Sequence, residues 1–276
     1  MNIKYVDAHC HIQFEQYAED DAALIDRMRV EGVAGVVVGV DKKSSKEAII
    51  LTKEHEHLFA SVGLHPNRVA DEPFDADVFR ELANNSKVVA IGECGLDYFR
   101  PAEVNDDVKN KQKKVLREHI ALAVELDKPL IIHARPSKGT KHPVGYPDAG
   151  DAYHDLIEIL KETKAEHGEA VCGDVHFFVG GIKEAEALIK LGFTISFTAV
   201  ITFTRDYDEV IRSVPIESIL SETDAPYVAP VSRRGERNDP LAVIDVVSKI
   251  AEIRNEPIET VRAALLANAS RIFSLN

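Results

Sequence analysis

Cysteine is scarce in this chain, and its few copies are widely separated. The 276 residues include three cysteines, Cys10, Cys94 and Cys172. An odd number of cysteines without a C-x-x-C pair suggests neither a disulfide framework nor a zinc site built from thiolates. The cysteine pattern therefore fits a reducing compartment.

Long apolar runs and a basic excess are also missing. No stretch approaches the roughly 18 uninterrupted apolar residues of a membrane-spanning helix, and the first residues contain no apolar signal segment. Lys and Arg number 33 against 46 Asp and Glu, which gives a formal net charge of −13. This balance argues against a broad basic surface that coats nucleic acid, but it leaves room for a local basic or metal-charged cleft. We expect a cytoplasmic protein without a membrane anchor.

Linkers, internal repeats and low-complexity tracts are absent as well, so we expect residues 1–276 to form a single domain. Short β-branched apolar runs alternate with longer segments of helical period, which is typical of βαβ units in a parallel sheet. The eight predicted strands cover residues 3–8, 33–40, 58–62, 88–91, 130–132, 170–175, 193–197 and 218–221. In a chain of this length, eight strands followed by helices predict an α/β fold, a closed (β/α)8 TIM barrel. An open doubly wound sheet is the alternative.

Polar side chains follow most of the predicted strands, at the end where a barrel places its active site. Asp7, His9 and His11 close the first strand, and the alternation of side chains puts all three on one face. The later strands are followed by His65, Glu93, His133, His176 and Asp224. Imidazole nitrogens and carboxylates suit divalent metal ions. The joint pattern predicts a metal site at the carboxyl ends of the strands, against the alternative that each polar residue caps its own strand.

Six motifs occur in the order seen in a known family: DAHCH, GLHP, GECGLDY, IIHAR, the segment that begins at His176, and ETDAPY. Through them the chain resembles TatD-type metal-dependent hydrolases, which have an amidohydrolase-type barrel, over nearly its whole length. The resemblance implies a (β/α)8 barrel and two divalent metal ions, Mg, Mn or Zn. It also implies hydrolysis of phosphodiester bonds, with DNase activity that includes removal of nucleotides from the 3′ end of single or frayed strands.

The resemblance assigns metal ligands position by position. One ion would be held by His9, His11 and Asp224, and the other by His133 and His176, with Glu93 bridging both. Two ions that lie close together need a shared acidic ligand, which agrees with the position of Glu93. Asp224 is also expected to accept a proton from the attacking water. Asp7 and Glu222 are expected to orient ligands rather than to bind metal.

Residues in loops near the predicted mouth are candidates for binding the substrate. The family resemblance assigns His65 to the substrate phosphate. The other candidates are Arg135, Arg233, Arg237 and Asn238. Arginine and amide side chains suit a nucleic-acid backbone, and the arginines after Asp224 supply positive charge in an acidic protein. A solvated loop arginine is the alternative for each of them.

One segment departs from the family pattern. Residues 135–150 are rich in Pro and Gly and form a longer connection than the family shows between its fifth strand and the next helix. The segment follows His133, so we expect either a substrate-selecting lid or a tolerated surface insertion. Because this segment bears on the substrate, two alternatives stay open: an amidohydrolase or lactonase for a small molecule, and a metal-binding protein without catalysis.

The expected partner is DNA or another phosphodiester substrate, with no membrane and no obligate protein partner. Five histidines lie outside the predicted site, on predicted helices, where we expect surface or helix-end positions. They are His55, His57, His119, His154 and His167.

Overall fold

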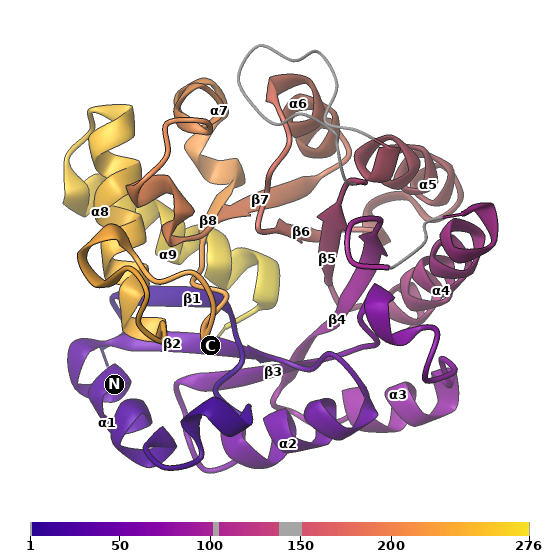
Figure 1. The fold of residues 1–276 in the computed structure, drawn as a ribbon, viewed down its shortest axis with the longest axis horizontal. Coiled ribbons are helices and arrows are strands. Elements are labelled where there is room, and N and C mark those ends of the chain that lie inside the picture. The colour runs from indigo at the N-terminus through magenta and orange to yellow at the C-terminus, as the bar shows by residue number, and fades with distance from the viewer. Residues whose placement is uncertain (1, 102–104, 138–150, 276) are drawn as a thin grey trace.

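The computed structural model describes residues 2–101, 105–137 and 151–275. Within them, eight parallel strands follow one another around a ring in the order β1 to β8. Helices α1 to α8 lie around the outside of the ring, and part of α9 lies behind its opening (Figure 1). This arrangement confirms the predicted TIM barrel. Most of the long segment 135–150, predicted as a lid or an insertion, lies outside the described residues.

The elements alternate along the chain as the sequence predicts. The strands are β1 (Tyr5–Cys10), β2 (Val33–Val38), β3 (Leu58–Val62), β4 (Val88–Asp97), β5 (Leu130–Arg135), β6 (Gly173–His176), β7 (Phe193–Phe197) and β8 (Ile219–Ser221). The helices are α1 (Asp21–Glu31), α2 (Lys42–Thr52), α3 (Ala76–Ala83), α4 (Asp106–Glu125), α5 (Asp151–His167), α6 (Ile182–Lys190), α7 (Asp208–Ser213), α8 (Val243–Arg254) and α9 (Ile258–Phe273). In the part of the chain that the structure describes, no helix is both long and apolar enough to cross a membrane.

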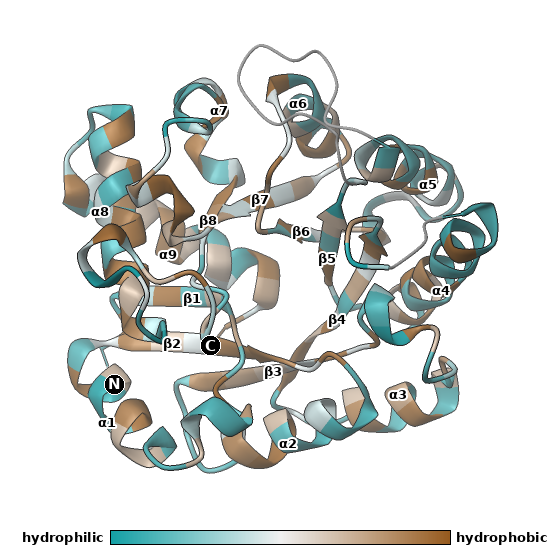
Figure 2. Ribbon diagram, viewed as in Figure 1, coloured by the Kyte–Doolittle hydropathy of each residue, from teal (hydrophilic) through white to brown (hydrophobic). Residues whose placement is uncertain are grey.

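Apolar side chains fill both the inside of the ring and the layer between strands and helices. An inner cluster combines small and branched side chains from five strands with two residues of α9. Its buried members are Val6, Ala8, Ala34, Val36, Val38, Ala90, Ile131, Leu220, Ala269 and Phe273. Figure 2 shows the complementary pattern on the outer helices, where hydrophilic and hydrophobic faces alternate. The packed interior fixes the strand ends that carry the site.

The seam between β1 and β8 closes the ring. Cys10 pairs with Ala225 in an isolated parallel bridge, and the backbone N–H of His11 donates to the carbonyl of Ala225 at 2.8 Å. The buried carboxylate of Asp7 accepts hydrogen bonds from the backbone N–H and the hydroxyl of Thr223, at 2.9 and 2.6 Å. A buried acid thus ties the two ends of the sheet together.

Strands β4 and β5 run further than predicted. The prediction ended them at residues 91 and 132, after the last β-branched residues, but the two strands stay paired as far as Asp97 and Arg135. Backbone pairing to a neighbouring strand continues through glycine and polar residues that lack a strand preference. As a result, Glu93 and His133 lie inside their strands rather than after them.

Two histidines predicted at the surface are buried. His119 on α4 is 0% exposed; its Nε2 accepts the backbone N–H of Leu64 at 3.0 Å, and its Nδ1 donates to the Val115 carbonyl at 2.8 Å. His57 is also buried, in the loop before β3 rather than on a helix. The surface prediction is wrong for both, because the tertiary packing of these positions gives each ring buried surroundings.

Candidate metal centre

All six predicted metal ligands converge at the carboxyl end of the barrel. Five of the six lie in or directly after strands β1, β4, β5 and β6, and the sixth follows β8. Their ligand atoms form overlapping groups in which the members lie within 4.8 Å of one another, namely His9 with His11 and Glu93, and Glu93 with His133 and His176. Asp224 adjoins the first group.

The first cluster surrounds one oxygen of Glu93. The Nε2 atoms of His9 and His11 lie 3.2 Å apart, and Glu93 Oε2 lies 3.4 Å from His9 Nε2. Asp224 Oδ1 lies 3.4 Å from His11 Nε2 and 3.9 Å from His9 Nε2. This cluster therefore contains two imidazoles and two carboxylates.

The second cluster surrounds the other oxygen of the same carboxylate. Glu93 Oε1 lies 2.9 Å from His176 Nε2, 3.1 Å from His133 Nδ1 and 3.3 Å from His65 Nε2. His133 Nδ1 and His176 Nε2 are themselves 3.2 Å apart. Glu93 thus presents one oxygen to each cluster and lies between them.

The charge state of the two carboxylates suits metal binding. Burial raises the pKa of Glu93, but the imidazoles of His65 and His176 outweigh this effect and hold the pKa well below its ordinary value. Burial also raises the pKa of Asp224, and a hydrogen bond from His11 helps to reverse the shift, so that the net direction is down. Ionised carboxylates and imidazole nitrogens that converge at this spacing form a donor set that fits divalent ions.

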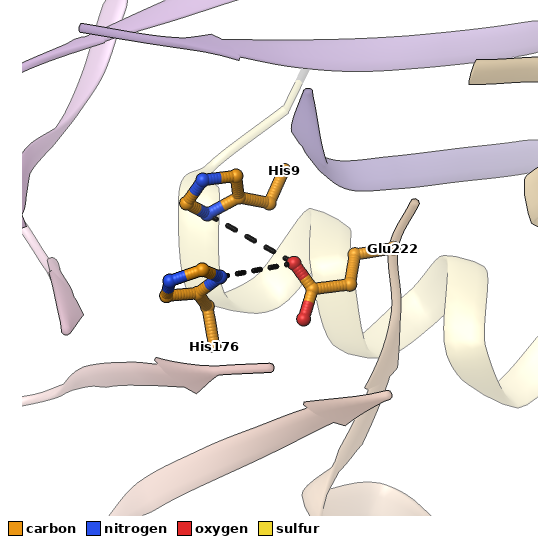
Figure 3. Close-up of side chains that lie close together, drawn as sticks. All are labelled: His9, His176 and Glu222. Carbon is orange, nitrogen blue, oxygen red and sulfur yellow. Dashed lines mark hydrogen bonds and ion pairs between the residues drawn. The ribbon is translucent and has the colours of Figure 1, made fainter. Parts of the chain in front are cut away.

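Glu222 lies behind the two clusters and contacts two of the rings (Figure 3). Its Oε2 lies 3.3 Å from Nδ1 of His176 and 3.9 Å from Nδ1 of His9. The two rings stack with centroids 3.8 Å apart, and the Nε2 atom of each faces Glu93. A carboxylate hydrogen-bonded to Nδ1 fixes the ring and leaves Nε2 for a metal, and Glu222 has this relationship to His176. Its distance to Nδ1 of His9 is that of an ion pair without a hydrogen bond.

Asp97 belongs to the site although the sequence analysis did not single it out. Its buried carboxylate lies 3.3 Å from Nε2 of His133 and accepts a hydrogen bond from the Asn67 amide at 2.9 Å. It is four residues after Glu93, so the two side chains share one face of β4 if the strand continues that far. This parity within the GECGLD motif was the available signal, and it was missed because the predicted strand stopped at residue 91.

Asp7 does not orient an imidazole in the way that was predicted. Its Oδ1 accepts the backbone N–H of His9 at 3.2 Å, and its other described contacts are with Thr223. Burial raises its pKa well above the ordinary value. Asp7 therefore acts on the backbone of the β1 and β8 ends, because its side chain points into the seam between these strands.

The candidate substrate residues divide into two groups. His65 and Arg135 line a cavity of about 1010 Å³, whose walls also include Glu93, His133 and Asp224. The described residues that line the cavity do not include Arg233, Arg237 or Asn238.

Arg233, Arg237 and Asn238, which do not line the cavity, each have partners elsewhere. Arg233 pairs with Asp239 at 2.9 Å, and Arg237 binds both carboxylate oxygens of Asp20 at 2.8 and 2.6 Å. Asn238 is 0% exposed, and its amide donates to three backbone carbonyls, at 2.8 to 3.3 Å. These contacts stabilise the loop after β8 and give no support to the predicted role of the three residues in binding substrate.

Comparison with known proteins agrees with this geometry. The family model for TatD related DNase matches residues 6–274. The chain belongs to the TatD family. Among its relatives, the uncharacterized metal-dependent hydrolase YabD of Bacillus subtilis is 36% identical over 274 residues, covering 98% of this chain and 99% of YabD. The uncharacterized metal-dependent hydrolase YcfH of Escherichia coli K12 is 32% identical over 278 residues, covering 98% of this chain and 96% of YcfH.

Solved structures of TatD-family proteins have the same fold. The TatD homologue YjjV of Escherichia coli superposes with a TM-score of 0.82 at 29% identity, and 99% of each chain is covered. A TatD-family hydrolase from Entamoeba histolytica gives a TM-score of 0.83 at 20% identity and covers 100% of both chains, which is a likeness of fold.

Proposed function

We propose that this TatD-family chain hydrolyses phosphodiester bonds in DNA with two divalent metal ions, releasing nucleotides from the 3′ end of single or frayed strands. The observation that carries the proposal is the position of Glu93, with one carboxylate oxygen facing each of two imidazole clusters. Enzymes that cleave phosphate esters commonly use two ions about 3.5 to 4 Å apart, which requires shared acidic ligands.

The ligands divide between the two sides of Glu93. His9, His11 and Asp224 would hold one ion and His133 and His176 the other, and Glu93 would contribute to both. When bound, such ions polarise a phosphoryl oxygen and lower the pKa of water. Mg, Mn and Zn all accept a set of imidazoles and carboxylates.

The other steps fall to side chains of the chain itself. The Asp224 side chain is 15% exposed and lines the cavity, so its carboxylate is placed to accept the proton that the attacking water loses. The imidazole of His65 lines the same cavity and is placed to contact a phosphoryl oxygen. Glu222 holds the ring of His176 through a hydrogen bond at Nδ1 and places its charge 3.9 Å from Nδ1 of His9.

The direct test is nucleotide release from a single-stranded oligodeoxynucleotide labelled at its 3′ end. Protein stripped of metal is resupplied with Mg²⁺, Mn²⁺ or Zn²⁺, and we expect release only after metal is restored. Asp224→Asn removes a ligand and the proton acceptor, so we expect activity to fall by at least a hundredfold.

Asp245→Asn on the exposed side of α8 is the matched control, and it is expected to retain activity. A strand that stays intact with every metal contradicts the proposal. A small ester or amide that is hydrolysed instead indicates an amidohydrolase or lactonase.

A further inference from the structure

Three arginines line one side of the cavity, next to the second cluster of ligands. Arg68 follows β3 in a short helix (Pro66–Arg68), Arg100 follows β4, and Arg135 ends β5. We call these three residues the basic arc. They come from the strands that carry His65, Glu93 and His133, so the arc lies on the β3 to β5 side of the site.

The arc differs from Arg233 and Arg237, after β8, in how its charge is compensated. Arg68 and Arg100 each contact one carboxylate, Asp41 and Asp97 respectively, at 3.8 Å, and each side chain is 53% exposed. By contrast, Arg237 is bound by both oxygens of Asp20. An ion pair at the long limit of the distance range, half exposed to solvent, holds its arginine weakly. Among the described residues, the arginines that line the cavity are the three of the arc, so the guanidinium charge next to the site is on the β3 to β5 side.

One buried carboxylate organises the arc and the metal ligand beside it. Asp97 Oδ1 accepts the backbone N–H groups of Phe99 and Arg100, both at 2.9 Å, while its Oδ2 reaches His133 Nε2 at 3.3 Å. The guanidinium of Arg135 lies over the Phe99 ring, 4.0 Å from its centroid. The turn after β4 is thus fixed relative to the second ligand cluster. This order reduces the conformational entropy that the protein loses when a nucleic-acid strand binds.

We propose that the basic arc binds the phosphates of nucleotides next to the one being cleaved, so that the site selects a phosphodiester chain over a small isolated diester. This inference rests on the proposed function and adds to it the residues that bind the strand beyond the cleaved nucleotide. A cavity of about 1010 Å³ is at the upper end of the range for small-molecule pockets. Three arginines from three successive strand ends can each bind a separate phosphate, because a guanidinium binds a phosphate through two N–H groups.

The test measures binding separately from cleavage. A fluorescein-labelled octathymidylate with phosphorothioate linkages, which resist hydrolysis, is titrated with Mn²⁺-loaded protein, and the dissociation constant is followed by fluorescence anisotropy at several salt concentrations. We expect Arg68→Gln and Arg100→Gln each to weaken binding about tenfold. In the double variant, the slope of log affinity against log salt should become shallower by about 1.4, since each phosphate contact on a single strand contributes about 0.7.

The matched control is Arg29→Gln on α1. Arg29 is 58% exposed and pairs with an aspartate three residues earlier, as Arg100 does. If the double variant has the affinity and salt slope of Arg29→Gln, or if the wild-type protein does not bind the strand, the inference is overturned. Failure of the proposed function gives a different result: the phosphorothioate strand is bound, but the unmodified strand is not cleaved with any metal.

A kinetic comparison adds a second readout. In the wild-type enzyme, kcat/KM is measured for the unmodified octathymidylate and for bis(p-nitrophenyl) phosphate. We expect the ratio of the two values to fall about tenfold in Arg100→Gln, through a higher KM for the strand. An unchanged ratio contradicts the selection of a chain by the arc.

Discussion

Oε1 of Glu93 lies 2.9 Å from Nε2 of His176. The second oxygen of the same carboxylate faces His9, at 3.4 Å from Nε2. One side chain of β4 therefore joins ligands that come from β1 and β6, two strands that are not neighbours in the sheet. The proposed two-metal site depends on that relationship.

Glu222 is expected to set metal affinity without binding a metal. Glu222→Gln removes the negative charge beside Nδ1 of His176 and His9, so His176 loses the charged partner that directs its Nε2 toward the site. Loss of such a partner typically weakens metal binding 10- to 100-fold. Competition with a fluorescent chelator measures the affinity.

Glu217→Gln, an exposed change just before β8, is the control for Glu222→Gln and is expected to bind metal like the wild-type protein. Equal affinities in the two variants would show that Glu222 does not orient the imidazoles.

Thr223 is expected to stabilise the seam of the barrel. Thr223→Val removes the hydroxyl that donates to Asp7 at 2.6 Å and leaves a buried carboxylate oxygen without that donor. The free energy of unfolding should fall by about 1 to 3 kcal/mol, measured by urea denaturation. Thr52→Val is the control, because the hydroxyl of Thr52 is buried but donates only to a helix carbonyl, at 3.2 Å. A loss of stability no larger than that of Thr52→Val would contradict the stabilising role of the Thr223 hydroxyl in the seam.

His119 is expected to make stability depend on pH. Burial lowers its pKa to about 4 in the folded protein, whereas an unfolded histidine has a pKa of about 6.5. As the pH is lowered, the unfolded chain therefore binds the proton before the folded protein does. The contribution of the neutral ring to the free energy of unfolding is complete above about pH 6.5 and is lost as the pH falls toward 4. The difference between the two pKa values corresponds to a full loss of roughly 3 kcal/mol in the free energy of unfolding.

His119→Gln cannot titrate and weakens the contacts of the ring with Leu64 and Val115. We expect it to be less stable than the wild-type protein at pH 7.5, by about 1 to 3 kcal/mol, with a gap that narrows as the pH is lowered to 4. His167→Gln on the exposed end of α5 is the control. Denaturant melts at each pH supply the values, and a gap independent of pH would refute the assignment.

The barrel and the convergence of the six predicted ligands could both be predicted from the sequence. Both follow from local patterns: apolar runs of strand length, and polar residues such as His9, Glu93 and His176 at the ends of those runs, which parallel strands bring to one face. His119 had a usable signal too, since Leu116, Ile120 and Ala123 place it on the buried face of its helix.

Contacts between distant parts of the chain were not predictable in the same way. The partner of Arg237 is Asp20, 217 residues away, and no local pattern indicates that this arginine is already paired. Likewise, only the register of β4 against β5 reveals that Asp97 lies beside His133. Side-chain pairing across the barrel depends on three-dimensional packing, which is why the pairing of Arg237 and the position of Asp97 beside His133 were not predicted.

The most direct test of the central claim is the metal content of Glu93→Gln. Wild-type and variant proteins are loaded with Mn²⁺ or Zn²⁺, freed of excess ion and analysed by elemental mass spectrometry, with circular dichroism to verify that both are folded. A carboxylate that bridges two ions predicts two metals per chain in the wild-type protein and one or none in the variant. Two metals per chain in a folded Glu93→Gln variant would contradict the bridging role and, with it, the proposed two-metal hydrolase.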